Sequence, residues 1–182
     1  MNPTDKYIQQ VADFRLATNL AVNSGEGWNK KQHIAITLEE LIEAADGMTD
    51  SIVTFAGIAL DAPVKKSSQA VAVIERIHQA MIHIGFKPDA CMDIVHAANM
   101  SKVCKADEVQ PTKNHYNMIG VECYDKPTDD GLSSVHVAKD VTAKDGKYYE
   151  QGKLLKCINW HEPDWSDLSQ WMESDLAELF TS

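Results

Sequence analysis

The sequence predicts a mainly α protein: a bundle of four to five helices with a small β-hairpin or irregular segment near residues 115–160. Two observations indicate this fold class. Through most of the first hundred positions, apolar residues recur every three or four residues, which is the spacing of a core-facing helix. After about residue 105, this spacing gives way to a stretch rich in Lys, Asp, Thr, Pro and Gly, which favours turns and short strands.

The predicted helices are bounded by residues that start or stop a helix. Thr4 or Asp5 can cap the first helix, and Ser67 or Ser68 can cap the third. Pro63 ends the second helix because proline cannot donate to the helical hydrogen-bond ladder. We expect helices over residues 4–22, from 30 to between 57 and 60, from 67 or 68 to 85, from 88 or 89 to about 103, and over 165–180.

The predicted β-structure is confined to short pieces. Residues 118–124 and 134–137 favour strands, and the string Lys144-Asp-Gly-Lys147 is typical of a tight turn. Residues 152–158 are a candidate strand of a small hairpin. We therefore predict one domain over residues 1–182, with an irregular insertion at about 105–150.

Composition and charge exclude several classes of protein. With 44% hydrophobic and 24% charged residues, the chain is not disordered as a whole. It has no apolar run long enough to span a membrane, and its first residues lack the apolar stretch of a secretory signal. The formal net charge of −10 would repel a phosphate backbone. We predict a cytoplasmic protein that binds neither duplex nucleic acid nor a membrane.

The cysteine spacing indicates neither a zinc knuckle nor a redox dithiol. Cys91, Cys104, Cys123 and Cys157 form no C-x-x-C pair. We expect buried or inert thiols in a reducing compartment.

The second predicted helix carries a ridge of carboxylates. Glu39, Glu43, Asp46 and Asp50 follow one another at spacings of 4, 3 and 4, which places them on one side of a helix. No Lys or Arg lies between Gln32 and Val64 to offset their repulsion. Oxygen ligands of this kind suit Mg²⁺ or Mn²⁺ and would convert repulsion into coordination. A solvated acidic face is the alternative explanation of the same spacing.

Four strings resemble the all-α NTP pyrophosphohydrolases, the MazG-like and phosphoribosyl-ATP-pyrophosphohydrolase-like superfamily. Leu38–Glu43 is similar to the E-E-x-x-E motif of this family, and Glu43–Gly57 is similar to its E-x-x-D-x-x-x-D motif with the apolar run that follows. Gly85–Lys102 resembles the segment ending in N-M-S-K in phage and integron members, and Gly152–Asp164 resembles their closing G-K-x-x-K and P-D stretch.

The resemblance implies a helical bundle that splits a nucleoside triphosphate into the monophosphate and pyrophosphate. The reaction would need Mg²⁺, for which Mn²⁺ could substitute. By this resemblance Glu40, Glu43 and Asp46 are metal ligands, and Glu39 or Asp50 is a further ligand or the catalytic base that activates water.

The resemblance also implies substrate-binding residues and a partner. Asn99 and Lys102 would contact phosphate or sugar, and Lys153 and Lys156 are further candidates for phosphate contact. Taken alone, Asn99 and Lys102 are explained better by a helix C-terminal turn, where a lysine interacts favourably with the helix dipole. By family analogy the chain forms a homodimer or a dimer of dimers.

There are two alternatives, and the first follows from the overlap of the acidic strings at Glu43, which the family places on separate helices. In one, the chain is a phage or mobile-element accessory protein that keeps the fold without catalysis. In the other, the pairs Glu75/His78 and Asp93/His96 form a carboxylate-bridged di-iron site with the glutamates of the second helix. A different register would assign the second acidic motif to the third helix, which offers only Glu75 and His78.

Overall fold

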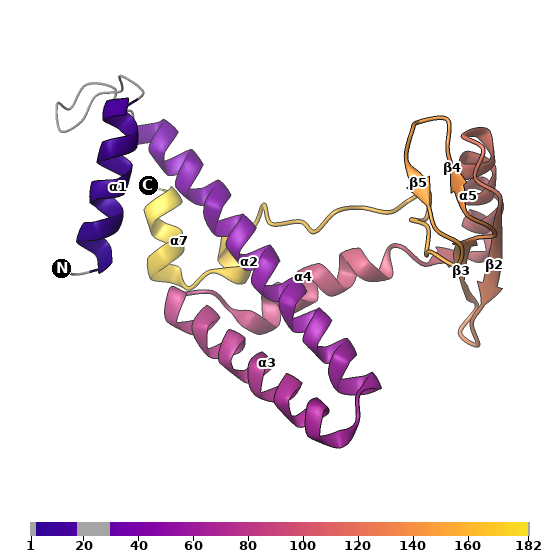
Figure 1. Ribbon diagram of the computed structural model, residues 1–182, viewed down its shortest axis with the longest axis horizontal. Helices are drawn as coiled ribbons and strands as arrows, with labels where there is room; N and C mark the ends of the chain where they lie inside the picture. The colour runs from indigo at the N-terminus through magenta and orange to yellow at the C-terminus, as the bar shows by residue number, and fades with distance from the viewer. Residues whose placement is uncertain (1–2, 18–29, 182) are drawn as a thin grey trace. The chain divides into compact units, whose positions relative to one another are not determined.

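The computed structural model describes residues 3–17 and 30–181 and confirms a mainly helical chain with a small antiparallel sheet portion (Figure 1). The helices among the described residues are α1 (Pro3–Ala17), α2 (Lys30–Asp61), α3 (Val64–Ile84), α4 (Pro88–Met100), α5 (Ala106–Met118), α6 (Leu168–Trp171) and α7 (Ser174–Thr181). The strands are β1 (Cys104–Lys105), β2 (Cys123–Pro127), β3 (Leu132–Val137), β4 (Val141–Thr142) and β5 (Tyr148–Tyr149). None of the described helices is long and apolar enough to cross a membrane.

The chain divides into two compact units, Met1–Leu41 and Ile42–Ser182. The first unit holds α1 and the beginning of α2. Residues 18–22, the predicted end of the first helix, lie outside the described residues. The second unit holds the remainder of α2 and every later element.

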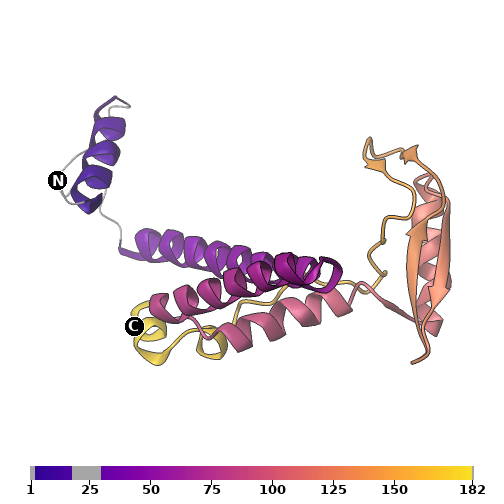
Figure 2. The same ribbon diagram turned by 60° about the horizontal axis from the view of Figure 1, so that its bottom comes forward.

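Within the second unit, α3 reverses the direction of α2 and α4 reverses it again (Figure 2). The predicted extent of α2 is confirmed, but the predicted cap of α3 is wrong, since α3 begins at Val64 directly after Pro63. The fixed φ of proline suits the residue before a helix, so no serine cap is needed. Gly85 ends α3 as predicted, in the left-handed conformation with φ of 98°. The end of α4 is Met100, three residues earlier than predicted.

The final predicted helix is interrupted. Met172 has an extended backbone between α6 and α7, and it forms an antiparallel bridge with Phe86. Phe86, Trp171 and Met172 are almost fully buried, and the rings of Phe86 and Trp171 are 5.7 Å apart. Packing against the turn after α3 therefore overrides the helical spacing of the sequence.

Residues 104–157, which we call the α/β segment, contain a helix that the sequence analysis missed. Residues 106–118 form α5, although the prediction was irregular structure. The backbone N–H of Lys105 donates to Glu108 Oε2 at 2.8 Å, which satisfies a group at the start of the helix. The polar composition and Pro111 conceal this helix in the sequence.

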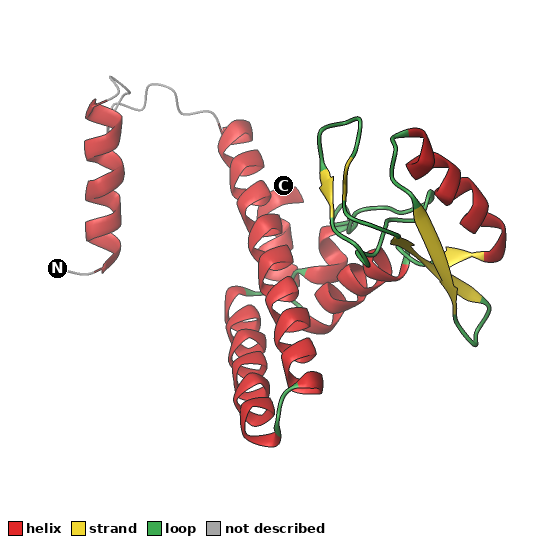
Figure 3. Ribbon diagram, turned by 45° about the vertical axis from the view of Figure 1, so that its right-hand side comes forward, coloured by secondary structure: helices red, strands yellow, loops and turns green. Residues whose placement is uncertain are grey.

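The sheet of the α/β segment has the order β1-β3-β2, with antiparallel pairing throughout. Inward residues of β3 are buried with Val121, Leu155 and both Cys104 and Cys157, and side chains of α5 pack against this core. Figure 3 shows α5 beside the sheet. The predicted strand 118–124 is largely wrong, because α5 continues to Met118 and β2 begins at Cys123. The predicted turn at 144–147 does join a hairpin, between β4 and β5.

Candidate functional site

The predicted carboxylates of α2 differ in their surroundings. Glu39, Glu40, Glu43 and Asp50 are exposed, whereas Asp46 is half-buried. Asp46 follows Ala45, which is fully buried together with Thr49, so Asp46 borders the buried side of the helix. Glu39 and Glu40 belong to the first unit, and the other three carboxylates belong to the second.

Asp46 is the carboxylate of this group whose surroundings shift its pKa. Burial raises the pKa of Asp46 above its ordinary value of 3.8, and the negative charge of Asp50 raises it further. A side-chain hydrogen bond with Trp165 opposes this increase, and the charge of Glu162 adds to it. The negative charge of Glu162, which lies between the α/β segment and α6, therefore acts on Asp46 of α2.

The N-M-S-K turn approaches the same segment. The hydroxyl of Ser101 donates to the carbonyl of Ala98 at 2.7 Å and lies 3.4 Å from the carbonyl of His161. The backbone N–H of His161 donates to Ser101 Oγ at 3.3 Å. Residues 161–165 therefore contact both the end of α4 and Asp46 of α2.

Asn99 and Lys102 form a pair, whereas Lys153 and Lys156 are engaged elsewhere. Lys102 Nζ donates to Asn99 Oδ1 at 2.5 Å, and both residues are half-buried. Lys153 Nζ lies 5.8 Å from the centre of the Tyr149 ring, and Lys156 Nζ lies 3.2 Å from the centre of the Trp160 ring. These cation–π contacts hold the two ammonium groups within residues 149–160.

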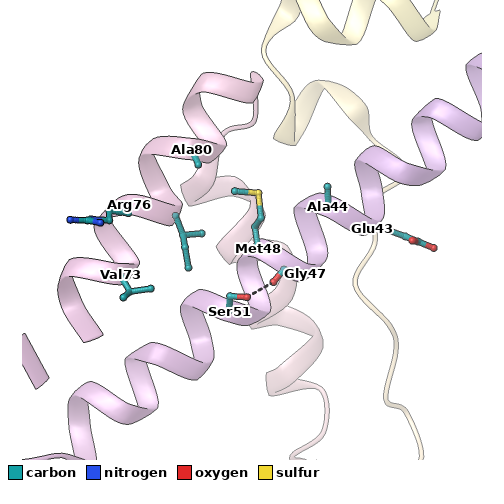
Figure 4. A pocket seen from close by; sticks show the side chains of 9 residues that line it. Glu43, Ala44, Gly47, Met48, Ser51, Val73, Arg76 and Ala80 are labelled. Atoms are coloured by element: carbon teal, nitrogen blue, oxygen red, sulfur yellow. Dashed lines mark hydrogen bonds between the residues drawn. The ribbon is translucent and has the colours of Figure 1, made fainter. Parts of the chain in front are cut away.

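Two cavities border the elements that carry these residues. A cavity of about 480 Å³ between α2 and α3 is lined mainly by small and apolar side chains, with Glu43 and Arg76 at its edge. Figure 4 shows Met48 reaching toward α3, while the charged ends of Glu43 and Arg76 point away in opposite directions. The apolar lining does not suit a triphosphate.

The second cavity, of about 210 Å³, lies between α4 and the residues that follow His161. Its lining includes Asp93, His161, Asp164 and Asp167. A hydrogen bond from the Ser166 hydroxyl holds the pKa of Asp164 below its usual range, with help from the backbone N–H of the same residue. Carboxylates of this kind suit a cation or a cation–phosphate complex better than a bare anion.

The residues of the di-iron alternative are not gathered together. Glu75 lines a cavity at the α2–α3 turn, whereas Asp93 lines the cavity beside His161. In the described ranges 3–17 and 30–181, no group of three or more His, Cys, Asp or Glu side chains is arranged to hold a metal ion. A cation at Asp46 would therefore be completed by water, by substrate oxygens or by side-chain movement.

The sequence analysis assigned no role to Ser101, His161 or Glu162. All three lie within the strings that carry the family resemblance, so those strings were the available signal. The signal was insufficient because the role of each residue depends on a long-range contact: Ser101 with His161, and Glu162 with Asp46.

Comparisons of the chain with protein-family models, with curated proteins and with solved structures find no match.

Proposed function

We propose that this chain is a nucleoside triphosphate pyrophosphohydrolase with the all-α bundle of that superfamily, which converts an NTP or dNTP and water into the monophosphate and pyrophosphate. One observation carries the proposal. Three of the strings that resemble this family meet at residues 161–165: Asp46 interacts with Glu162 and Trp165, and Ser101 is hydrogen-bonded to His161.

The donor set supports a hard divalent cation. Asp46, Asp50 and Glu162 supply carboxylate oxygens, and burial together with the charges of Asp50 and Glu162 raises the pKa of Asp46. Together with the exposed Glu43, they would hold Mg²⁺, for which Mn²⁺ could substitute. The cation, when bound, neutralises charge on the triphosphate and on the departing pyrophosphate.

The remaining chemistry belongs to side chains of this chain. Asp50, where it is not a ligand of the cation, would orient the attacking water and accept its proton. Lys102 would contact a phosphate oxygen, and its hydrogen bond with Asn99 holds the ammonium group in one place. The water oxygen bonds to the α-phosphorus, the bond from that phosphorus to the bridging oxygen breaks, and pyrophosphate leaves.

A second copy of the chain is the expected partner, in a homodimer or a dimer of dimers. Leu60 and Val64, which flank the turn between α2 and α3, are 85% and 83% exposed. Val64 also lines a cavity at this turn, and an exposed apolar surface of this kind is typical of a helix-packing interface. Such an interface would cover these residues in the assembly.

The overlap of the two acidic strings at Glu43 favours a second candidate, a non-enzymatic accessory protein with the same fold. The two candidates differ in a direct assay. Purified protein is incubated with Mg²⁺ or Mn²⁺ and each common NTP and dNTP, and the products are resolved by anion-exchange chromatography.

We expect a monophosphate and pyrophosphate, with turnover lowered about 100-fold or more in Asp46→Asn. The amide keeps the shape of the side chain and can still accept the hydrogen bond from Trp165. Asp61→Asn, at the exposed end of α2, is the matched control and should retain activity. Lack of turnover on every nucleotide with either cation would reject the enzyme and favour the accessory protein.

A further inference from the structure

Two free cysteines lie together in the core of the α/β segment. Cys104 is fully buried and Cys157 is 4% exposed. Both come from chain segments that follow the same edge of β3. Cys104 is paired with Ser133, while the backbone N–H of Leu155 donates to the carbonyl of Val135 at 2.8 Å. This arrangement brings the two cysteines together although they are far apart in sequence.

The hydroxyl of Thr112 contacts both sulfur atoms. Thr112 Oγ1 is 3.4 Å from Cys104 Sγ and 3.6 Å from Cys157 Sγ. The backbone N–H of Ile158 donates to the same oxygen at 3.0 Å and fixes its position. Cys157 also contributes to the raised pKa of Cys104. The pair is therefore held in proximity by several contacts of buried atoms.

We propose that Cys104 and Cys157 are an oxidisable dithiol, which a peroxide converts into a reversible disulfide. The overall reaction joins the two sulfur atoms, releases both thiol hydrogens and reduces one hydrogen peroxide to two molecules of water. This proposal is independent of nucleotide hydrolysis.

The surroundings indicate which sulfur reacts first. Burial raises the pKa of Cys104 to about 12, so this group remains a thiol at neutral pH. Cys157 instead donates its S–H to Glu108 Oε2 at 3.5 Å. Cys157 attacks the peroxide, the O–O bond breaks, and a sulfenic acid and one water form. Cys104 then displaces the sulfenic hydroxyl, which leaves with the remaining thiol proton as the second water.

The disulfide would join the same two chain segments that the proposed site joins. Cys104 lies two residues after Lys102, and Cys157 lies four residues before His161. Ser101 and His161 are already connected by hydrogen bonds. Oxidation would therefore add a covalent connection next to this contact and limit the separation of the two segments.

The test uses the full chain, with reductant removed and hydrogen peroxide added. Remaining thiols are alkylated, and the unreduced protein is digested for peptide mass mapping. We expect one linked peptide pair containing Cys104 and Cys157, two hydrogens lighter than the reduced pair, while Cys91 and Cys123 stay alkylated. The link should disappear after treatment with a reductant.

A second measurement follows the melting temperature of the oxidised and the reduced chain. A disulfide closing a loop of about fifty residues should raise the melting temperature by about 5–10 °C, reversibly. Cys157→Ser should abolish this increase, and Cys91→Ser, which removes a buried thiol of α4, should leave it intact. The proposal is wrong if the oxidised wild-type chain yields no linked Cys104–Cys157 peptides, or if its melting temperature does not rise.

Discussion

The surroundings lower the pKa of several carboxyl groups in the α/β segment and raise the pKa of Asp46 on α2. Hydrogen bonds lower the pKa values of Glu108, Glu122 and Asp125 below their ordinary values. Burial and neighbouring negative charge instead raise the pKa of Asp46. Ionised Asp125 supports the fold through its partly buried ion pair with Lys113, whereas ionised Asp46 weakens the fold. Groups held at such a cost are more frequent at functional sites than elsewhere, which is why Asp46 is central to the proposed site.

The two regions also differ in packing: the α/β segment has a buried core, whereas the α2–α3 turn exposes apolar side chains. Val121, Val135 and Val137 of the α/β segment are fully buried around its sheet. The α2–α3 hairpin leaves Leu60 and Val64 exposed at its turn. A sealed core makes a segment stable by its own contacts, whereas an exposed apolar surface is stabilised when a partner covers it.

The largest expected effect tests this difference in packing. Val135→Asp places a carboxylate without a partner in the core of the α/β segment. We expect a loss of about 4 kcal/mol or more in the free energy of unfolding, because a buried unpaired charge is strongly destabilising. Urea unfolding followed by circular dichroism measures the change. A loss below about 1 kcal/mol would contradict a sealed core.

Val64→Asp is the matched control for that substitution. An aspartate at the first residue of α3 faces water and interacts favourably with the helix dipole. The free energy of unfolding of the dissociated chain should change by less than about 0.5 kcal/mol. Sedimentation velocity should instead show weaker self-association. Unchanged self-association would remove the α2–α3 turn from the proposed dimer interface.

The boundaries of α2 could be predicted because they depend on local information: a long apolar period and a proline at position 63. The helix α5 could not, because its polar sequence is stabilised by packing on the sheet. The break at Met172 likewise depends on pairing with Phe86. Spacing and chemistry therefore identify elements whose signals are local, and long-range contacts decide the rest.

The same limit applies to the candidate site. The acidic spacing on α2 identified Asp46 and Asp50, and the N-M-S-K string identified Asn99 and Lys102. Periodicity alone could not indicate that Asp46 is half-buried while its neighbours on the ridge are exposed. That difference arises from contacts with Trp165 and the residues before it.

A smaller effect tests whether carboxylates support the α/β segment. Lys113 Nζ donates to Asp125 Oδ1 at 2.8 Å, and this bond lowers the pKa of Asp125. Asp125→Asn should cost up to about 1 kcal/mol at neutral pH, as expected for a partly exposed ion pair. The stabilisation by ionised Asp125 is lost as pH falls through its lowered pKa, so wild type and variant should converge in acid.

Glu122→Gln provides the comparison for Asp125→Asn. Its ion pair with Lys139 is short, at 2.7 Å, but the two side chains are 64% and 68% exposed. Water screens such a pair, so we expect no measurable change in the urea midpoint. An equal loss of unfolding free energy in the two variants would show that burial does not determine how much these ion pairs stabilise the fold.

The smallest expected effect has the opposite sign and belongs to α2. Asp46→Asn should increase the free energy of unfolding at neutral pH by roughly 0.5 kcal/mol, since it removes a charge that burial and Asp50 disfavour. Because the pKa of Asp46 is raised in the folded state, the wild type loses stability as pH rises from its ordinary value of 3.8 through the raised value. Chemical unfolding across this interval, without added cation, should show the advantage of the variant growing with pH.

Asp164→Asn is the control: the pKa of Asp164 is lowered by its bonds to Ser166, so its removal should lower stability at neutral pH. A destabilised Asp46→Asn variant would mean that the hydrogen bond with Trp165 outweighs the repulsion. Asp46 would then be a structural residue like the carboxylates of the α/β segment, and the main support for a functional site on α2 would be lost.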